Sequence, residues 1–243
     1  MKVITNTFQP FLTPGQEVPR ELVSDLLTRY STHEGYTLFP DVLPFFEMLK
    51  RRSMQPGINT SWKWDKTIVG IITNSDDRVP SVLESFGLKI GPRRVGSAGE
   101  RIAQANLDDD VSFVVLSYDV GVEKPDRRMF EAATQMLQET AAEKFGHDGS
   151  VTGEGFSKLY VGDSLEHDYF GAKEAEWDAV LVDRSNWSAT ETKTGSKETP
   201  LSGLYTQGRT AAGVTKEVVT CNDLAALAGW QPGNSTHIDI GIT

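Results

Sequence analysis

The chain has 243 residues, of which 38% are hydrophobic, and this is enough for one sizeable α/β core or for a core with a small accessory subdomain. A formal net charge of −10 excludes a broad surface for nucleic acid or for an anionic membrane, because both would need clustered lysine and arginine. The one cysteine, Cys221, excludes an intrachain disulfide, and no cysteine and histidine cluster has the spacing of zinc ligands.

The first predicted element is a helix near the N-terminus. Its apolar residues, among them Leu22, Val23 and Leu26, recur at helical spacing between residues 18 and 30. The segment before it, residues 1–11, lacks the unbroken apolar stretch of a secretory signal, and no apolar run elsewhere is long enough to span a bilayer. We therefore expect a cytoplasmic protein.

Strands and helices then alternate along the chain. The predicted helices are residues 41–51, 79–86, 127–137 and 167–177, and the predicted strands are residues 67–73, 112–117, 158–161 and 179–182, followed by a short strand and helix within residues 218–227. Three polar segments, residues 53–65, 145–156 and 185–216, are typical of mobile surface insertions. The alternation predicts an α/β fold with a parallel sheet and crossover helices.

Polar residues follow the predicted strands, and ligands of open parallel sheets bind outside these carboxyl ends. Thr73 and Asn74 close the first strand, and their hydroxyl and amide groups can donate hydrogen bonds to a phosphoryl oxygen. Lys124 follows the second strand and can neutralise charge on a transferring phosphoryl group. Taken singly, Thr73 and Asn74 are also ordinary turn formers, and Lys124 is equally compatible with a solvated lysine at a helix entrance.

Two carboxylates follow the third strand. Asp163 and Asp168 lie five positions apart across a strand-to-helix turn that can aim both groups into one crevice. Mg²⁺ prefers a few carboxylate oxygens together with water and substrate phosphate, so the pair predicts a magnesium site. The alternative is that one of the two aspartates caps the helix.

The stretches IITNSDD, GVEKPDRRMF and GDSLEHDYFGA resemble the second, third and fourth motifs of the haloacid dehalogenase superfamily, in its capped, phosphatase-like branch. The resemblance implies that Thr73 and Asn74 bind the substrate phosphate. It further implies that Lys124 binds this phosphate and is catalytic, and that Asp163 and Asp168 hold Mg²⁺.

The same resemblance divides the chain. Residues 36–230 are similar to the family's α/β core, which is a Rossmann-like three-layer structure around a parallel sheet. Residues 1–35 resemble part of the helical cap that screens the substrate in this family, and residues 231–243 are expected to form a flexible tail.

One family motif is missing. The family's first motif, Asp-x-Asp, ends an apolar N-terminal strand; its first Asp attacks phosphorus and its second acts as general acid and base. Nothing before Thr67 has this form, and the terminal IDIGIT resembles it only superficially. A truncated start, a degenerate paralogue or completion by a partner would each explain this, and a start within the cap-like segment favours truncation.

The absent motif also affects the sheet, because the family's first strand is its central one. Without it, two interior strands would have unpaired backbone groups or would pair with each other. We expect that such free edges allow the chain to associate with itself.

The leading functional hypothesis is a Mg²⁺-dependent, phosphatase-type hydrolase of small phosphorylated metabolites by descent, inactive without its first motif. The alternative is a non-catalytic module that binds phosphate or Mg²⁺ or acts as a scaffold. A dinucleotide-dependent enzyme is disfavoured, because no G-x-G-x-x-G follows any predicted strand.

Overall fold

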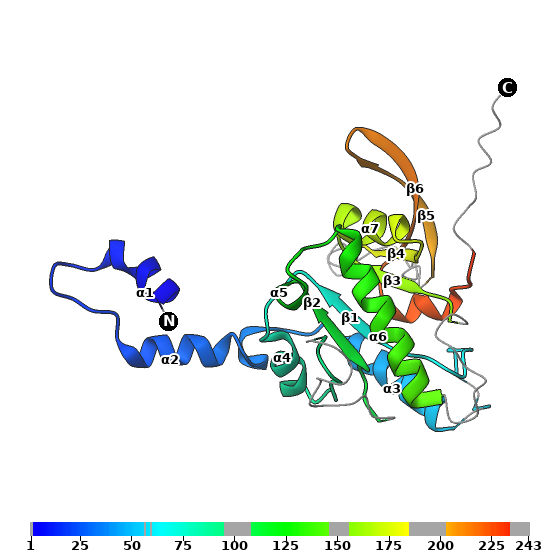
Figure 1. Cartoon of the computed structure of the whole chain (residues 1–243), viewed down its shortest axis with the longest axis horizontal. Helices are drawn as coiled ribbons and strands as arrows, with labels where there is room; N and C mark the ends of the chain where they lie inside the picture. The colour runs from blue at the N-terminus through cyan, green and yellow to red at the C-terminus, as the bar shows by residue number, and fades with distance from the viewer. Residues whose placement is uncertain are drawn as a thin grey trace, which may run out of the picture.

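A computed structural model of the chain describes residues 2–55, 57–58, 60–94, 108–145, 156–184 and 203–233. The body of the molecule contains two strand ladders flanked by helices, and an arm built from the first helices extends away from it (Figure 1). Within the described residues, no helix has both the length and the apolar composition needed to cross a membrane.

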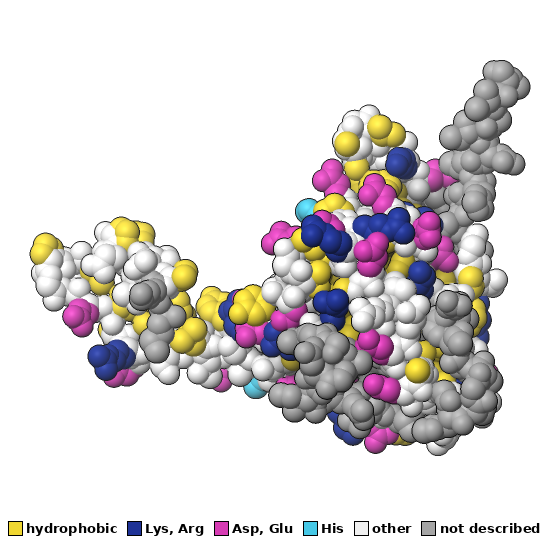
Figure 2. Space-filling view, viewed as in Figure 1, with side chains coloured by type: hydrophobic (Ala, Val, Ile, Leu, Met, Phe, Trp, Pro, Cys, Tyr) yellow, Lys and Arg dark blue, Asp and Glu magenta, His cyan; other side chains and the backbone are white. Residues whose placement is uncertain are grey.

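The arm consists of helix α1 (Lys2–Phe8), the 3-10 turn η1 (Gln9–Phe11) and helix α2 (Arg20–Arg29). Helix α2 confirms the predicted N-terminal helix, and Val23 is buried on it. Other large apolar side chains of the arm, among them Val3, Phe11 and Leu27, are exposed, and Figure 2 shows hydrophobic patches along the arm. The arm therefore leaves much of its apolar surface in water.

The body begins after the turn η2 (His33–Gly35). Its helical elements are α3 (Val42–Met54), α4 (Val79–Ser85), α5 (Ser117–Val120), α6 (Arg127–Phe145), the π-helical turn η6 (Leu165–Phe170), α7 (Gly171–Glu174) and the 3-10 segment η8 (Leu224–Gly229). Its strands are β1 (Gly70–Thr73), β2 (Phe113–Leu116), β3 (Leu159–Gly162), β4 (Asp178–Val182), β5 (Tyr205–Ala211) and β6 (Val214–Cys221). Strands and helices alternate as far as β4, which is the predicted α/β pattern.

The strands of the described residues form two sheets instead of one continuous sheet. Strand β1 pairs with β2 in parallel, and the second sheet has the order β3-β4-β6-β5, in which β5 alone is antiparallel. The backbone of Val69 faces β2, because its carbonyl accepts a hydrogen bond from Ser112 N at 2.7 Å. By the two-residue period of a strand, Gly70 and Ile72 face the opposite edge, which is not paired with β3.

The two sheets share one hydrophobic core. On one face, helix α6 packs in a single apolar cluster with Ile72 of β1, Phe113 of β2 and Tyr160 of β3. On the other face, Leu49 of α3 packs in a second cluster with Val180 of β4. Helices thus cover both faces of the strands, which confirms the expected three-layer arrangement.

The predicted polar insertion at residues 185–216 is wrong at its C-terminal end. There β5 and β6 form an antiparallel hairpin, paired from Tyr205 with Thr220 to Ala211 with Val214. Polar residues lie on both faces of the ribbon near its tip, so its sequence lacks the apolar alternation of a half-buried strand. Residues 185–202, residues 146–155 of the second predicted insertion and residues 234–243 of the predicted tail lie outside the described residues.

The first predicted insertion, residues 53–65, is also wrong in part. Trp62 is buried in the cluster with Leu49, and its indole nitrogen donates a hydrogen bond to Thr67 Oγ1 at 2.9 Å. Thr67 thus belongs to this packed segment through its hydrogen bond with Trp62. The first strand begins at Gly70, not at the predicted residue 67.

A half-buried ion pair links the carboxyl end of β4 to the start of α3. The Arg184 guanidinium donates to both carboxylate oxygens of Asp41 at 2.9 Å, and Leu224 N donates to Asp41 Oδ2 at 2.8 Å. Burial acts to raise the pKa of Asp41, but these hydrogen bonds outweigh it and the pKa lies below its ordinary value. Nearby on β6, Cys221 is fully buried, and desolvation raises the pKa of its thiol to about 12.

Candidate functional site

A buried polar network lies between β1 and β3. Lys124 Nζ donates to Asp168 Oδ1 at 2.6 Å and to the Tyr160 hydroxyl at 2.7 Å. That hydroxyl lies 2.8 Å from the carbonyl oxygen of Ile72 and 3.2 Å from Asp168 Oδ1, so its single proton serves these two acceptors. Tyr160 on β3 therefore reaches across to the unpaired edge of β1.

The members of this network are buried. Lys124 and Asp168 are 8% and 5% exposed, so each buried charge depends on the other. Burial, together with the negative charge of Asp168 and Asp163, raises the pKa of Tyr160 well above its ordinary value and keeps the hydroxyl protonated. The reading of Lys124 as a solvated lysine at a helix entrance is therefore wrong.

Asn74 fixes the backbone of Lys124. Its Oδ1 accepts a hydrogen bond from Lys124 N at 2.6 Å, and its Nδ2 donates to Lys124 O at 3.0 Å. Asn74 is thus more than a turn former, since its side chain links the loop after β1 to the loop before α6. Its predicted contact with phosphate stays a prediction, and in this structure its amide has a positioning role.

The turn after β3 positions the Asp168 carboxylate through a backbone hydrogen bond. Its Oδ2 accepts from Ser164 N at 2.9 Å, and the Ser164 hydroxyl caps η6 by accepting from His167 N at 3.2 Å. Ser164 is therefore the N-cap residue, and Asp168 also takes part in the cap, because its carboxylate accepts the hydrogen bond from the Ser164 amide. A Cβ on Gly162 would lie 2.4 Å from Asp168 Oδ2, so the absence of a side chain at residue 162 lets the carboxylate approach β3.

Thr73 and Asp163 are the last residue of β1 and the first residue after β3. Thr73 is half-buried and Asp163 is exposed, and the described part of the chain shows no side-chain hydrogen bond or ion pair for either. Asp163 is close enough to Tyr160 for its charge to act on that hydroxyl. The structure thus joins Asn74, Lys124 and Asp168 directly, and places Thr73 and Asp163 at the ends of the two strands that flank them.

Mg²⁺ is usually held in proteins by one or two carboxylates together with water and substrate phosphate. Asp163 offers an exposed carboxylate, whereas both oxygens of Asp168 are already hydrogen-bonded. No group of three or more histidine, cysteine or acidic side chains among the described residues is arranged to hold a metal ion. The described residues therefore do not form an all-protein magnesium cage, and Asp163 is the carboxylate of the pair that remains available to a cation.

Tyr160 and Ser164 belong to the hydrogen-bond network of the candidate site, and neither was predicted as a site residue from the sequence. Tyr160 stood in the apolar run LYVG, where a buried hydroxyl needs a partner and so signals a polar contact. Ser164 directly precedes the turn and is a strong N-cap residue type, which was a second available signal.

Comparison with known proteins gives the following relatives. Residues 6–176 match the model of the haloacid dehalogenase-like hydrolase family. An uncharacterized hydrolase of Schizosaccharomyces pombe is 30% identical over 183 residues, which are 75% of this chain and 60% of that protein. An uncharacterized protein of Saccharomyces cerevisiae is 26% identical over 187 residues, which are 76% of this chain and 49% of that protein. The chain spans 49% to 60% of the length of these relatives.

A solved structure is also similar. The crystal structure of a HAD phosphatase from Thermococcus onnurineus matches with a TM-score of 0.42 and 21% sequence identity, over 78% of this chain and 60% of that one.

Proposed function

We propose that this chain carries the phosphate- and Mg²⁺-binding part of a phosphatase-type site for small phosphorylated metabolites. The chain belongs to the haloacid dehalogenase-like hydrolase family, and the proposal starts from that membership. We further propose that it does not turn over substrate alone. The observation that supports this most directly is the buried network of Lys124, Asp168 and Tyr160 at the strand ends that carry Thr73 and Asp163.

Lys124 is the proposed contact for the phosphoryl group. Its ammonium has three N–H donors, and two of them go to Asp168 and Tyr160. The third is available to a phosphoryl oxygen, and the held geometry lets it act on charge that develops during transfer. In this proposal Asn74 fixes the backbone of Lys124 and Thr73 supplies a hydroxyl donor at the end of β1.

Asp163 is the proposed direct ligand of Mg²⁺, and Asp168 supports it as the second acidic residue. A bound Mg²⁺ would neutralise charge on the substrate phosphate and orient it. Asp168 meanwhile orients the Lys124 ammonium, since it is the lysine's carboxylate partner. The division of labour follows from exposure, because Asp163 is exposed and Asp168 is buried.

The proposed lack of turnover rests on the absent Asp-x-Asp motif, since phosphoryl transfer in this family begins at its first Asp. The test uses the full chain with a generic phosphate ester, p-nitrophenyl phosphate, and Mg²⁺. We expect no release of nitrophenolate above background, but saturable Mg²⁺ and inorganic phosphate binding by calorimetry that weakens strongly in Asp163→Asn. Robust turnover that disappears in Asp163→Ala would overturn the claim of inactivity.

A second candidate function is a scaffold without metal affinity. It is favoured by one observation, namely that both oxygens of Asp168 are already hydrogen-bonded within the protein. Thermal unfolding distinguishes the two candidate functions, because a ligand that binds only the folded state raises the melting temperature. No rise with either Mg²⁺ or inorganic phosphate would favour the scaffold and would count against the binding site proposed above.

A further inference from the structure

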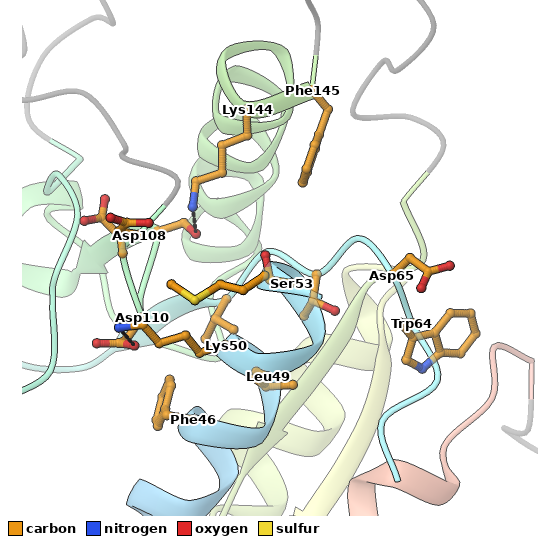
Figure 3. Close-up of a pocket in the computed structure, with 15 residues that line it drawn as sticks. Phe46, Leu49, Lys50, Ser53, Trp64, Asp65, Asp108, Asp110, Lys144 and Phe145 are labelled. Carbon is orange, nitrogen blue, oxygen red and sulfur yellow. Dashed lines mark hydrogen bonds and ion pairs between the residues drawn. The ribbon is translucent and has the colours of Figure 1, made fainter. Parts of the chain in front are cut away.

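A cavity lies at the amino-terminal end of strands β1 and β2, away from the candidate phosphate site at their carboxyl ends. It has a volume of about 220 Å³ and is lined by α3, by the end of α6 and by the segments that lead into β1 and β2 (Figure 3). Val69 and Ser112 border it and immediately precede those strands, whereas Thr73 ends β1. Four strand residues at about 3.3 Å each separate the two ends, so the cavity is distinct from the candidate phosphate site.

Lys144 is the cation that marks this cavity. Its amine donates one hydrogen bond to the Ser112 hydroxyl at 3.0 Å, and Ser112 is 2% exposed. No carboxylate of the described residues forms an ion pair with it within 4.0 Å, although burial lowers the pKa of Lys144 against the opposing charges of Asp109 and Asp108. A lysine has three N–H donors, and Ser112 is the acceptor that Lys144 has among the described residues, so donors remain for a ligand acceptor.

The other lysine of the lining is already paired. Lys50 Nζ lies 3.9 Å from Asp110 Oδ1, and Asp65 is paired outside the cavity with Arg52 at 2.6 Å. Asp108 lines the cavity and, within the described part of the chain, has no ion pair. The cavity thus presents a donor at Lys144 and an acceptor at Asp108, which act on each other electrostatically but do not touch.

The rest of the lining is largely apolar. Phe46 and Leu49 of α3, Phe145 at the end of α6 and Trp64 are among the lining residues, and Figure 3 shows them spread along the cavity. At about 220 Å³ the cavity is smaller than the ~300–1,000 Å³ pockets that hold drug-sized ligands. Its occupant should therefore be compact, with one apolar group.

We propose that this cavity binds a free α-amino acid with an apolar side chain. The ligand's carboxylate would accept from Lys144 and the Ser112 hydroxyl, its ammonium would donate to Asp108, and its side chain would pack against Phe46 and Phe145. The neighbouring aspartates disfavour a simple anion, and the lysine disfavours a simple cation. A zwitterion satisfies both sides at once, because it places opposite charges a few ångströms apart.

The test measures binding of L-phenylalanine to the full chain by calorimetry. Two analogues, 3-phenylpropionate without the ammonium and phenethylamine without the carboxylate, keep the same ring. We expect L-phenylalanine to bind and each analogue to bind at least about tenfold more weakly, since a charged hydrogen bond contributes about 1.5–3 kcal/mol. Lys144→Met and Asp108→Asn should each weaken binding to a similar extent, whereas the matched Lys89→Met, an exposed lysine outside the lining, should not.

Two results would overturn the proposal. One is no saturable binding of L-phenylalanine by the folded wild-type chain, and the other is equal binding of 3-phenylpropionate, which would mark a plain anion site. If Lys144→Met fails to fold, the analogue series on the wild-type chain still decides the question. Asp163→Asn should leave L-phenylalanine binding unchanged, so failure here and failure of the proposed phosphatase-type site are separate outcomes.

Discussion

Lys124 and Asp168 form the most deeply buried ion pair of the site, with side chains 9% and 7% exposed. Removing one charge leaves the other without compensation in a dry environment, which typically costs about 3–5 kcal/mol. We therefore expect Lys124→Met to lower the free energy of unfolding by about this amount, measured by urea denaturation at neutral pH.

The control for this prediction is Arg127→Met, which removes an ion pair with Glu131 whose side chains are 58% and 59% exposed. Exposed pairs contribute about 0–1 kcal/mol, so this variant should unfold almost as the wild type does. The double variant Lys124→Met with Asp168→Leu should recover part of the loss, because no buried charge remains. A Lys124→Met variant as stable as Arg127→Met would contradict the burial of the pair.

The ion pair of Asp41 and Arg184 gives a pH prediction. The pKa of Asp41 is lowered in the folded chain, so its contribution to stability is fully present above the unfolded value of about 3.9 and is lost as pH falls through the lower folded value. The difference in melting temperature between the wild type and Asp41→Asn should be constant from neutral pH to about pH 5. It should shrink below pH 4, and a difference that instead grows on acidification would be incompatible with the lowered pKa.

The turn between β3 and η6 depends on Gly162. A Cβ there would lie 2.4 Å from Asp168 Oδ2 and 2.5 Å from Asp168 Cγ, so Gly162→Ala must displace the carboxylate that Lys124 needs. We expect a loss of about 1–3 kcal/mol in the free energy of unfolding, as for other overpacked sites. Gly229→Ala is the matched control, because its Cβ would meet nothing within 4 Å. Equal stability of the two variants would show that the turn tolerates a side chain.

The elements that the sequence predicted well are those with a clear apolar pattern. Strands β2 and β4 lie close to their predicted ranges, because each is a short run of buried apolar residues. Helix α6 begins at the predicted residue 127 but continues to residue 145, beyond its predicted end at residue 137. The β5–β6 hairpin escaped prediction because much of its length carries polar residues on both faces. Lys124 in a loop and Asp168 in the turn η6 were predictable because both follow predicted strands, whereas Tyr160 lies within strand β3.

At the scale of the whole molecule, the described strands form two sheets that share one hydrophobic core. Gly70 and Ile72 face the unpaired edge of β1, and the Tyr160 hydroxyl satisfies one carbonyl there. Buried backbone groups without partners are costly, so this edge is the place where another extended segment would be stabilised. Self-association through these edges stays a prediction.

Hydrogen exchange tests the state of that edge. In dilute protein we expect the amides of Gly70 and Ile72 to exchange faster than those of Ile71 and Thr73, which face β2. If chains associate through the edge, raising the concentration should slow exchange at Gly70 and Ile72 together with a shift to larger species in sedimentation. Equal protection of all four amides at every concentration would mean that the edge is already occupied.

The buried thiol of Cys221 can report on local opening of the fold, through the rate at which a reagent modifies it. A thiol that is fully buried and ionises only near pH 12 cannot attack a disulfide reagent while β6 stays packed. Modification by dithionitrobenzoate therefore counts openings of the region around β4 and β6, with no dye or tag added. Any small molecule that binds the closed form should slow this modification, so candidate ligands can be ranked without a catalytic assay.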